Sequence, residues 1–230
     1  MGFGRAGDQR NITARVREAT ERGRDGAGND QRVRICVINP VRAMACWGLG
    51  RIGGGRVADS TVRRATAADA ATIADVQIQV WQQAFSELLP TSVVFTDPVQ
   101  HAATWDARLR QGGPVLLAFE GDAPVGFAAV SGELDDRNLL APIGEIEVLY
   151  VVPRWGRRGH GGRLLAGAAA ELRRIGATSA QCWIPESDKA STTFLTRAGW
   201  AADGVRRELD TGAEPIFEVR FSGSVDLVAV

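Results

Sequence analysis

The stretch that decides the fold is Glu145–Leu165, which reads EIEVLYVVPRWGRRGHGGRLL. Its first half is a largely apolar run that ends at Pro153, as is typical of a buried strand. Its second half is rich in arginine and glycine and leads directly into a helical pattern of leucines and alanines. The stretch therefore predicts a strand, a polar loop and the first turn of a helix in immediate succession.

The loop of this stretch has the composition of an anion site. Residues 157–162 supply successive backbone N–H groups, and Gly159 and Gly161 let a ligand approach the main chain closely. A helix N-terminus has unpaired donors and the positive end of the helix dipole, so it favours phosphate. Positive charge is added by Arg157, Arg158 and Arg163. We therefore predict a pyrophosphate site. It is not a P-loop, because no Gly-Lys-Ser/Thr follows, and not a dinucleotide-binding fold, because crossover helices are missing before it.

Outward from this stretch, short apolar runs alternate with amphipathic segments from residue 60 onward. Strands are expected at 61–65, 115–120, 125–131, 143–152, 180–184, 200–208 and 215–221. Helices are expected at about 67–86, 98–110, 161–175 and 188–197, the first of them opened by a capping box. The order β-α-α-β-β-β-α-β-α-β-β predicts a mixed α/β layer fold.

Residues 1–59 differ from the rest of the chain in composition and charge. The first sixty residues hold 11 of the 27 basic residues and 6 of the 27 acidic ones, so the remainder is mildly acidic. Glycine and arginine are dense there, and only Val33–Ile38 forms an apolar run that is compatible with a strand. We interpret residues 1–59 as a low-complexity, mostly disordered tail and residues 60–225 as the working domain.

Charge and cysteine content exclude several classes of protein. A net charge of zero argues against a general nucleic-acid binder, which leaves the Arg-rich tail as the alternative place for such a contact. The three cysteines, Cys36, Cys46 and Cys182, fit neither a zinc site nor a disulfide framework. We therefore expect no metal and a reducing, cytoplasmic location. No apolar run reaches the roughly 18 residues of a membrane helix, so no membrane partner is expected.

The deciding stretch resembles the acetyl-CoA signature of the GNAT N-acetyltransferase superfamily. That signature is a strand ending Leu-x-Val-x-Pro, then Gln/Arg-x-x-Gly-x-Gly/Ala and a helix. Here it reads LYVVP over Leu149–Pro153 and GRRGHG over Gly156–Gly161. Phe194–Trp200 resembles the family's closing helix and turn, and Trp81–Pro90 resembles the opening of a bacterial subgroup. The resemblance covers about residues 60–222.

The resemblance implies a mostly antiparallel central sheet that is flanked by helices and in which two neighbouring strands splay apart. It also implies that the pantetheine arm of acetyl-CoA lies between these strands, against the backbone of Leu149, Tyr150 and Val151. The other residues expected to hold the cofactor are Arg157, Arg158, Gly159, His160, Gly161, Gly162, Arg163 and, from the last helix, Ser191.

The activity that the resemblance implies is transfer of an acetyl group from acetyl-CoA to an amine by direct attack in a ternary complex. Glu145 and Glu147 share one strand face, and either carboxylate is a candidate base for the incoming ammonium. Glu145 stands about as far before the glycine loop as a catalytic Glu often does in the family. Two ordinary acids on a solvent-facing strand are the plain alternative. Trp81 and Phe85 share a helix face and are candidates for the acceptor pocket or for the core.

Two positions depart from the family pattern. Gly156 stands where Gln or Arg usually opens the loop motif, and backbone groups can compensate for this change. Leu195 stands where the family often has a Tyr that protonates the leaving thiolate, so a Tyr acid is not carried over; Ser191 is the nearest hydroxyl. The alternative function is therefore a non-catalytic acyl-CoA sensor of the same fold. The acceptor, a small-molecule or protein amine, stays open, as does a homodimer.

Overall fold

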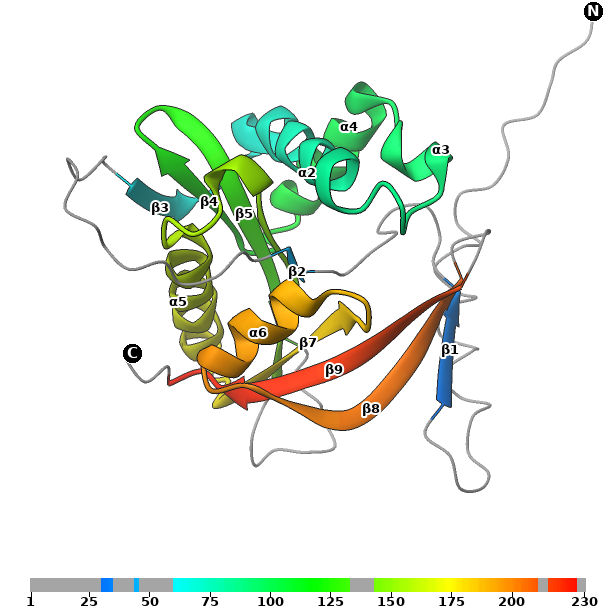
Figure 1. Ribbon diagram of the computed structural model, residues 1–230. Coiled ribbons are helices and arrows are strands. Elements are labelled where there is room, and N and C mark those ends of the chain that lie inside the picture. The colour runs from blue at the N-terminus through cyan, green and yellow to red at the C-terminus, as the bar shows by residue number, and fades with distance from the viewer. Residues whose placement is uncertain (1–29, 35–43, 46–59, 133–142, 211–214, 227–230) are drawn as a thin grey trace, which may run out of the picture.

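The computed structural model describes residues 30–34, 44–45, 60–132, 143–210 and 215–226 (Figure 1). Nine strands of this part of the chain form one sheet, in the order β1-β8-β9-β7-β6-β5-β4-β3, with β2 beside β6. The strands are β1 (Asp30–Arg34), β2 (Met44–Ala45), β3 (Ser60–Arg64), β4 (Val115–Glu120), β5 (Ala123–Gly132), β6 (Ile143–Val151), β7 (Ser179–Pro185), β8 (Ala201–Asp210) and β9 (Ile216–Ser224).

Helices cover both faces of the sheet. They are α2 (Ala70–Ala84), α3 (Thr91–Val94), α4 (Pro98–Arg110), α5 (His160–Arg174) and α6 (Lys189–Arg197), with short 3₁₀ turns η2 (Ala67–Asp69) and η3 (Pro153–Trp155). Figure 1 shows α2, α3 and α4 grouped on one side, and α5 and α6 on the other. This arrangement confirms the predicted mixed α/β fold with a mostly antiparallel sheet between helices.

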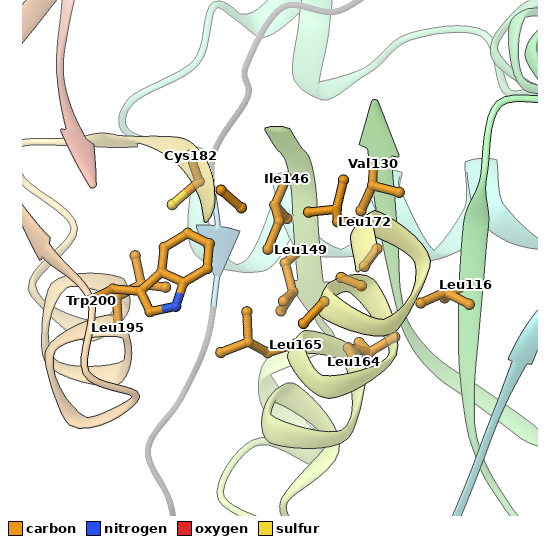
Figure 2. Close-up of a cluster of buried hydrophobic side chains, with 14 of the residues drawn as sticks. Leu116, Val130, Ile146, Leu149, Leu164, Leu165, Leu172, Cys182, Leu195 and Trp200 are labelled. Atoms are coloured by element: carbon orange, nitrogen blue, oxygen red, sulfur yellow. The ribbon is translucent and has the colours of Figure 1, made fainter. Parts of the chain in front are cut away.

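Two hydrophobic cores lie on the two faces of the sheet. The first joins α5 and α6 to the sheet, and Figure 2 shows part of it, with Leu164 and Leu165 of α5 facing Leu149 of β6. The second joins α2 and α4 to the opposite face and contains Trp81 and Tyr150. Side chains that alternate along β6 enter one core or the other, because successive residues of a strand point to opposite faces.

The helices begin where local sequence supplies caps. Thr66 and Asp69 form the predicted capping box before α2. Asp97 accepts the backbone N–H of Val99 at the start of α4, and Asp188 does the same for Ser191 at the start of α6. Each of these caps satisfies helix donors that would otherwise lack a partner.

The sheet changes character between β6 and β7. Most neighbouring strands are antiparallel, but β6 and β7 run parallel and pair only over Ile143–Glu145 and Ser179–Gln181. Beyond that point β6 continues to Val151 paired with β5, while β7 continues to Pro185 paired with β9. The two strands therefore part, as the predicted splay requires, and the sheet has an opening between its halves.

Part of the N-terminal segment joins this sheet. β1 pairs in parallel with β8, and β2 pairs in parallel with Leu149 and Tyr150 of β6. Since β5 already occupies the other edge of β6 at these residues, β2 lies on the edge that faces the opening. Most of the predicted disordered tail, 1–59, and most of the predicted strand Val33–Ile38 lie outside the described residues.

Candidate functional site

The middle of β6 contains a bulge at Glu147. Ala129 of β5 pairs with Val148, and the next residue, Val130, pairs with Ile146, so the register skips Glu147. Ile146 belongs to the core beneath α5, whereas Val148 belongs to the core beneath α2 and α4. The bulge thus changes which side chains of β6 enter each core, as bulges near functional sites commonly do.

Glu147 is held by an arginine from α4. Arg108 donates to both carboxylate oxygens, at 2.7 and 3.0 Å, and Glu147 is only 6% exposed. Arg108 also donates to the carbonyl oxygen of Val130 at 3.2 Å. This charge-assisted pair joins α4 to the sheet. A carboxylate engaged at both oxygens has little freedom to accept a substrate proton.

Glu145 lies where β6 and β7 begin to part. Its backbone is in register with Gln181 of β7 and Ser131 of β5. Gly144 faces Leu172 of α5, so strand alternation places the half-buried Glu145 side chain on the α2 and α4 face, which is also the face of Glu147. Both predicted bases therefore lie on one face, but they have different neighbours.

Cys182 of β7 is fully buried and carries no disulfide. Burial, with the charges of Glu145 and Glu218, raises the pKa of its thiol well above the usual value. The Cys182 thiol is therefore protonated at neutral pH and is a core side chain rather than a nucleophile. Cys36 and Cys46 lie outside the described residues.

The glycine loop forms the start of α5. Gly159 has φ +84° and is the residue before the helix, and Arg157 also adopts a positive φ, +62°. Arg157, Arg158 and Arg163 are all exposed beside this turn. Arg163 reaches back to donate to the carbonyl oxygen of Arg158 at 3.1 Å. The loop and helix start therefore offer clustered N–H donors and three guanidinium groups, which suits a phosphate ligand.

The ring of His160, the first residue of α5, turns away from solvent. It is 1% exposed, and its Nε2 atom lies 3.0 Å from Oε2 of Glu120 at the end of β4. Burial lowers the pKa of His160, so the imidazole is neutral near pH 7. Only its backbone is therefore available to a ligand in the loop.

Trp81 and Phe85, the two aromatics predicted for the acceptor site, occupy different depths. Trp81 is 1% exposed, and its indole N–H donates to the hydroxyl of Tyr150 at 3.3 Å. Phe85 packs against the Tyr150 ring, with centroids 5.9 Å apart, and also lines a pocket of about 470 Å³. The pocket is lined by Ala84, Phe85, Glu87, Leu88, Ser187, Asp188, Lys189 and Ala190. Phe85 can contact a ligand there, while Trp81 supports it from the core.

Ser191 belongs to the cap of α6. Its hydroxyl donates to Oδ2 of Asp188 at 2.6 Å, and its backbone N–H donates to Oδ1 at 3.0 Å. Ser191 is fully buried, and burial raises the pKa of Asp188. The hydroxyl proton of Ser191 is therefore engaged by Asp188. Leu195, at the position where the family often has a Tyr, is apolar and buried. Ser191, the nearest hydroxyl, does not line the pocket beside Phe85.

Within the described residues, no group of three or more His, Cys, Asp or Glu side chains could hold a metal ion. In the same part of the chain, no helix is long and apolar enough to cross a membrane.

Comparisons with known proteins agree with this arrangement. The sequence model of the acetyltransferase (GNAT) family matches residues 79–200. No curated protein matches the chain. Among solved structures, a putative acetyltransferase, YncA, from Salmonella typhimurium, determined with acetyl-CoA, is 21% identical, with a TM-score of 0.57 over 74% of this chain and 96% of that one.

Two other solved structures have the same fold. Ribosomal-protein-alanine N-acetyltransferase from Brucella melitensis is 19% identical, with a TM-score of 0.57 over 71% of this chain and 99% of that one. The PaiA N-acetyltransferase from Thermoplasma acidophilum, in complex with coenzyme A, is 14% identical, with a TM-score of 0.56 over 72% and 99%. At these identities the likeness is one of fold.

Proposed function

Because the chain belongs to the GNAT family of acetyltransferases, we propose that it transfers an acetyl group from acetyl-CoA to an amine by direct attack in a ternary complex. The main support for this proposal is that the two parts of the expected donor site, a strand edge and a helix start, follow each other directly along the chain. β6 ends at Val151 on the opening, and η3 leads from it at once into the loop that starts α5. One segment thus offers an extended backbone and then an anion site, in the order of pantetheine and pyrophosphate.

The donor would lie across these two parts. Backbone groups of Leu149, Tyr150 and Val151 would hold the pantetheine arm as an added strand. The pyrophosphate would contact the N–H groups of residues 157–162 and the arginines beside them. Relatives of this fold whose structures contain acetyl-CoA or coenzyme A support the choice of donor.

The reaction needs a neutral amine near the thioester. The amine nitrogen attacks the carbonyl carbon, the new C–N bond replaces the C–S bond, and the CoA thiolate leaves. Most amines are protonated at pH 7, so a base helps. We assign this role to Glu145, acting directly or through water, because it lies half-buried where β6 and β7 part, whereas Glu147 is 6% exposed and accepts from Arg108 at both oxygens. Positioning of both substrates supplies much of the rate.

A side-chain acid is not required in this scheme. A thiol has a pKa near 8.5, so its thiolate is a tolerable leaving group. The Tyr150 hydroxyl lies in the core beside Trp81, and the Ser191 hydroxyl is bonded to Asp188. These contacts support departure of the thiolate without a proton from either residue.

The pocket beside Phe85 suggests which amines to try first. Its walls combine Phe85 and Leu88 with two carboxylates, Glu87 and Asp188, and one ammonium, Lys189. An excess of negative charge favours a cationic acceptor and disfavours one with its own carboxylate. An apolar amine such as phenethylamine should therefore be a better acceptor than phenylalanine, which differs from it by one carboxylate.

The proposal is tested by measuring thiol release from acetyl-CoA with a panel of amines that includes such matched pairs. Release that depends on the acceptor, with the acetylated amine found by mass spectrometry, is expected. Tight binding of CoA in calorimetry without turnover of any amine would instead favour the non-catalytic sensor. This second candidate is supported by the buried, apolar Leu195 at the position where the family often has a Tyr. Absence of CoA binding would exclude both.

A further inference from the structure

A carboxylate lies directly beneath the loop that is rich in positive charge. Glu120 ends β4, and its side chain is 13% exposed. It faces the first residue of α5, His160, and lies 3.7 Å from a guanidinium nitrogen of Arg158. A negative charge at this place opposes the binding of phosphate. The Glu120 carboxylate would therefore be unfavourable for a phosphate site unless it also orders the groups that bind the phosphate.

The contacts of Glu120 connect three separate elements. Ser60 of β3 stands opposite Glu120 in the antiparallel pairing and donates its hydroxyl to Oε2 at 2.6 Å. The same oxygen is 3.0 Å from Nε2 of His160. Oε1 faces Arg158 in the loop. One carboxylate thus joins β3 and β4 to both the loop and the first turn of α5.

The charge of Glu120 is largely compensated within the protein. The hydrogen bond from the Ser60 hydroxyl, followed by the charges of Arg158 and Arg163, lowers the pKa of the Glu120 carboxyl. Glu120 is therefore ionised at neutral pH, and much of its field is directed at its neighbours rather than at a ligand.

The position of His160 makes this contact relevant to ligand binding. His160 follows Gly159, whose left-handed conformation starts the helix, and its ring is almost fully buried. A buried ring that is fixed at the first helical residue also fixes the direction of the backbone N–H groups around it. These are the donors that a phosphate at the helix start would use.

We propose that Glu120 is a positioning residue for the pyrophosphate: together with Ser60 it holds His160 and Arg158, and through them it sets the geometry of the loop. This inference rests on the proposed function, since the ligand in question is CoA. Glu120 does not contact the ligand. Its effect is confined to the part of CoA that the loop binds, and the pantetheine arm is held elsewhere, along β6.

The test compares two ligands by calorimetry in the full-length chain: CoA and pantetheine, which lacks the pyrophosphate. Glu120→Ala should weaken CoA binding about tenfold, because it removes the Ser60 hydrogen bond and the close contacts with His160 and Arg158, and should leave pantetheine binding unchanged. Glu120→Gln, which keeps an acceptor oxygen for Ser60 and a polar group of the same size beside His160, should restore CoA affinity to within about threefold of wild type. Ser60→Ala should weaken CoA binding in the same direction and should disturb folding less.

The sign of the effect separates positioning from simple repulsion. If Glu120 acts only through its charge, Glu120→Ala and Glu120→Gln both strengthen CoA binding, and the proposal is wrong. Glu171 provides a matched control, because it lies on α5, the helix that begins at His160, has a side chain 14% exposed and pairs with Arg64 and Arg174. Glu171→Ala should lower stability but not CoA affinity. Wild-type protein that binds neither ligand would refute the proposed function itself.

Discussion

Glu145 and Glu147 show how strongly the role of a residue depends on its neighbours. Both are carboxylates on the same face of β6, two positions apart. Glu147 is bound at both oxygens by Arg108, whereas Glu145 is half-buried where β6 and β7 part. The guanidinium that pairs with Glu147 comes from a residue 39 positions away, so the sequence motif itself gives no sign of the difference.

We predict that Glu145→Gln lowers kcat at pH 7 by roughly 10²–10⁴, because the acceptor ammonium loses its base. The rate should recover in part as the pH approaches the pKa of the amine itself, and CoA binding should not change. The measurement is kcat from pH 6 to 9 with an acceptor found in the amine panel. A wild-type rate throughout that range would show that Glu145 is not the base.

Glu147→Gln is the matched variant on the same strand. It leaves one Arg108 contact without its charged partner, so the free energy of unfolding should fall by about 1–3 kcal/mol. Chemical denaturation of both variants separates the two roles. Because Glu147 is 6% exposed and Glu145 is half-buried, the loss of stability should be larger for Glu147→Gln than for Glu145→Gln.

At the scale of elements, the start of α5 is where local conformation and ligand binding meet. Gly159 adopts φ +84°, a conformation that costs a residue with a Cβ about 1 kcal/mol. A Cβ there would also lie 2.9 Å from Nη1 of Arg163, which donates to Arg158 across the loop. An added methyl group would therefore disturb both the turn and its arginines.

Gly159→Ala should lower stability by about 1 kcal/mol and weaken CoA binding about tenfold. Gly199, just after α6, has φ +82° and no atom within 4 Å of an added Cβ. Gly199→Ala should therefore show the same loss of stability with unchanged CoA affinity. Thermal unfolding and calorimetry on both variants test this, and equal CoA affinities in the two would argue against a ligand at the helix start.

Most elements could be predicted from sequence because their signals are local. The apolar spacing of Leu164, Leu165, Ala168 and Leu172 predicted α5, and Pro153 marked the end of β6. The four-residue helix α3 was missed because one turn has too few residues to show a period. Likewise, the site contacts Ser60–Glu120 and Glu120–His160 were not predicted. Strand pairing brings Ser60 to Glu120, 60 positions away, and the packing of α5 against the sheet brings His160 to the same carboxylate.

At the scale of the whole molecule, pH should affect stability through two buried histidines. His101 and His160 are the only histidines of the chain, and burial lowers the pKa of both below the usual 6.5. The unfolded chain takes up a proton near pH 6.5, but the folded chain does not, so the free energy of unfolding falls as the pH decreases. From pH 7.5 to 5.5 each histidine contributes a loss of up to about 1.4 kcal/mol.

His101→Gln removes the contribution of one of these histidines to the pH dependence of stability. His101 contacts the side-chain oxygen of Gln77 at 2.8 Å, and a glutamine amide can donate to the same atom. Urea unfolding at pH 7.5 and 5.5 should show a smaller loss for the variant than for wild type. The comparison uses this difference because Asp188, whose pKa burial raises, acts in the opposite direction. Identical losses would mean that folding does not lower the pKa of His101.

The N-terminal segment should compete with the donor. β2 occupies the edge of β6 at Leu149 and Tyr150, where the proposed function places pantetheine. Deleting residues 1–58 should therefore tighten CoA binding, by about threefold or more, since the binding-competent fraction of the protein increases. Deletion of residues 1–29, which keeps β1 and β2, is the control and should leave the affinity unchanged. If both deletions behave like the full chain, β2 does not obstruct the ligand.

The short pairing between β6 and β7 also affects local opening of the sheet. Only the pairs from Ile143 to Glu145 connect the two strands directly, so the β7–β9 half can separate from the rest by local opening without global unfolding. A ligand seated between the strands would bridge them and suppress that opening. Amide hydrogen exchange should then slow with CoA in 146–152 and 180–185, and much less in α2. Uniform slowing would indicate global stabilisation. Slowing confined to these strand residues would indicate that bound CoA connects β6 and β7 as an additional strand would.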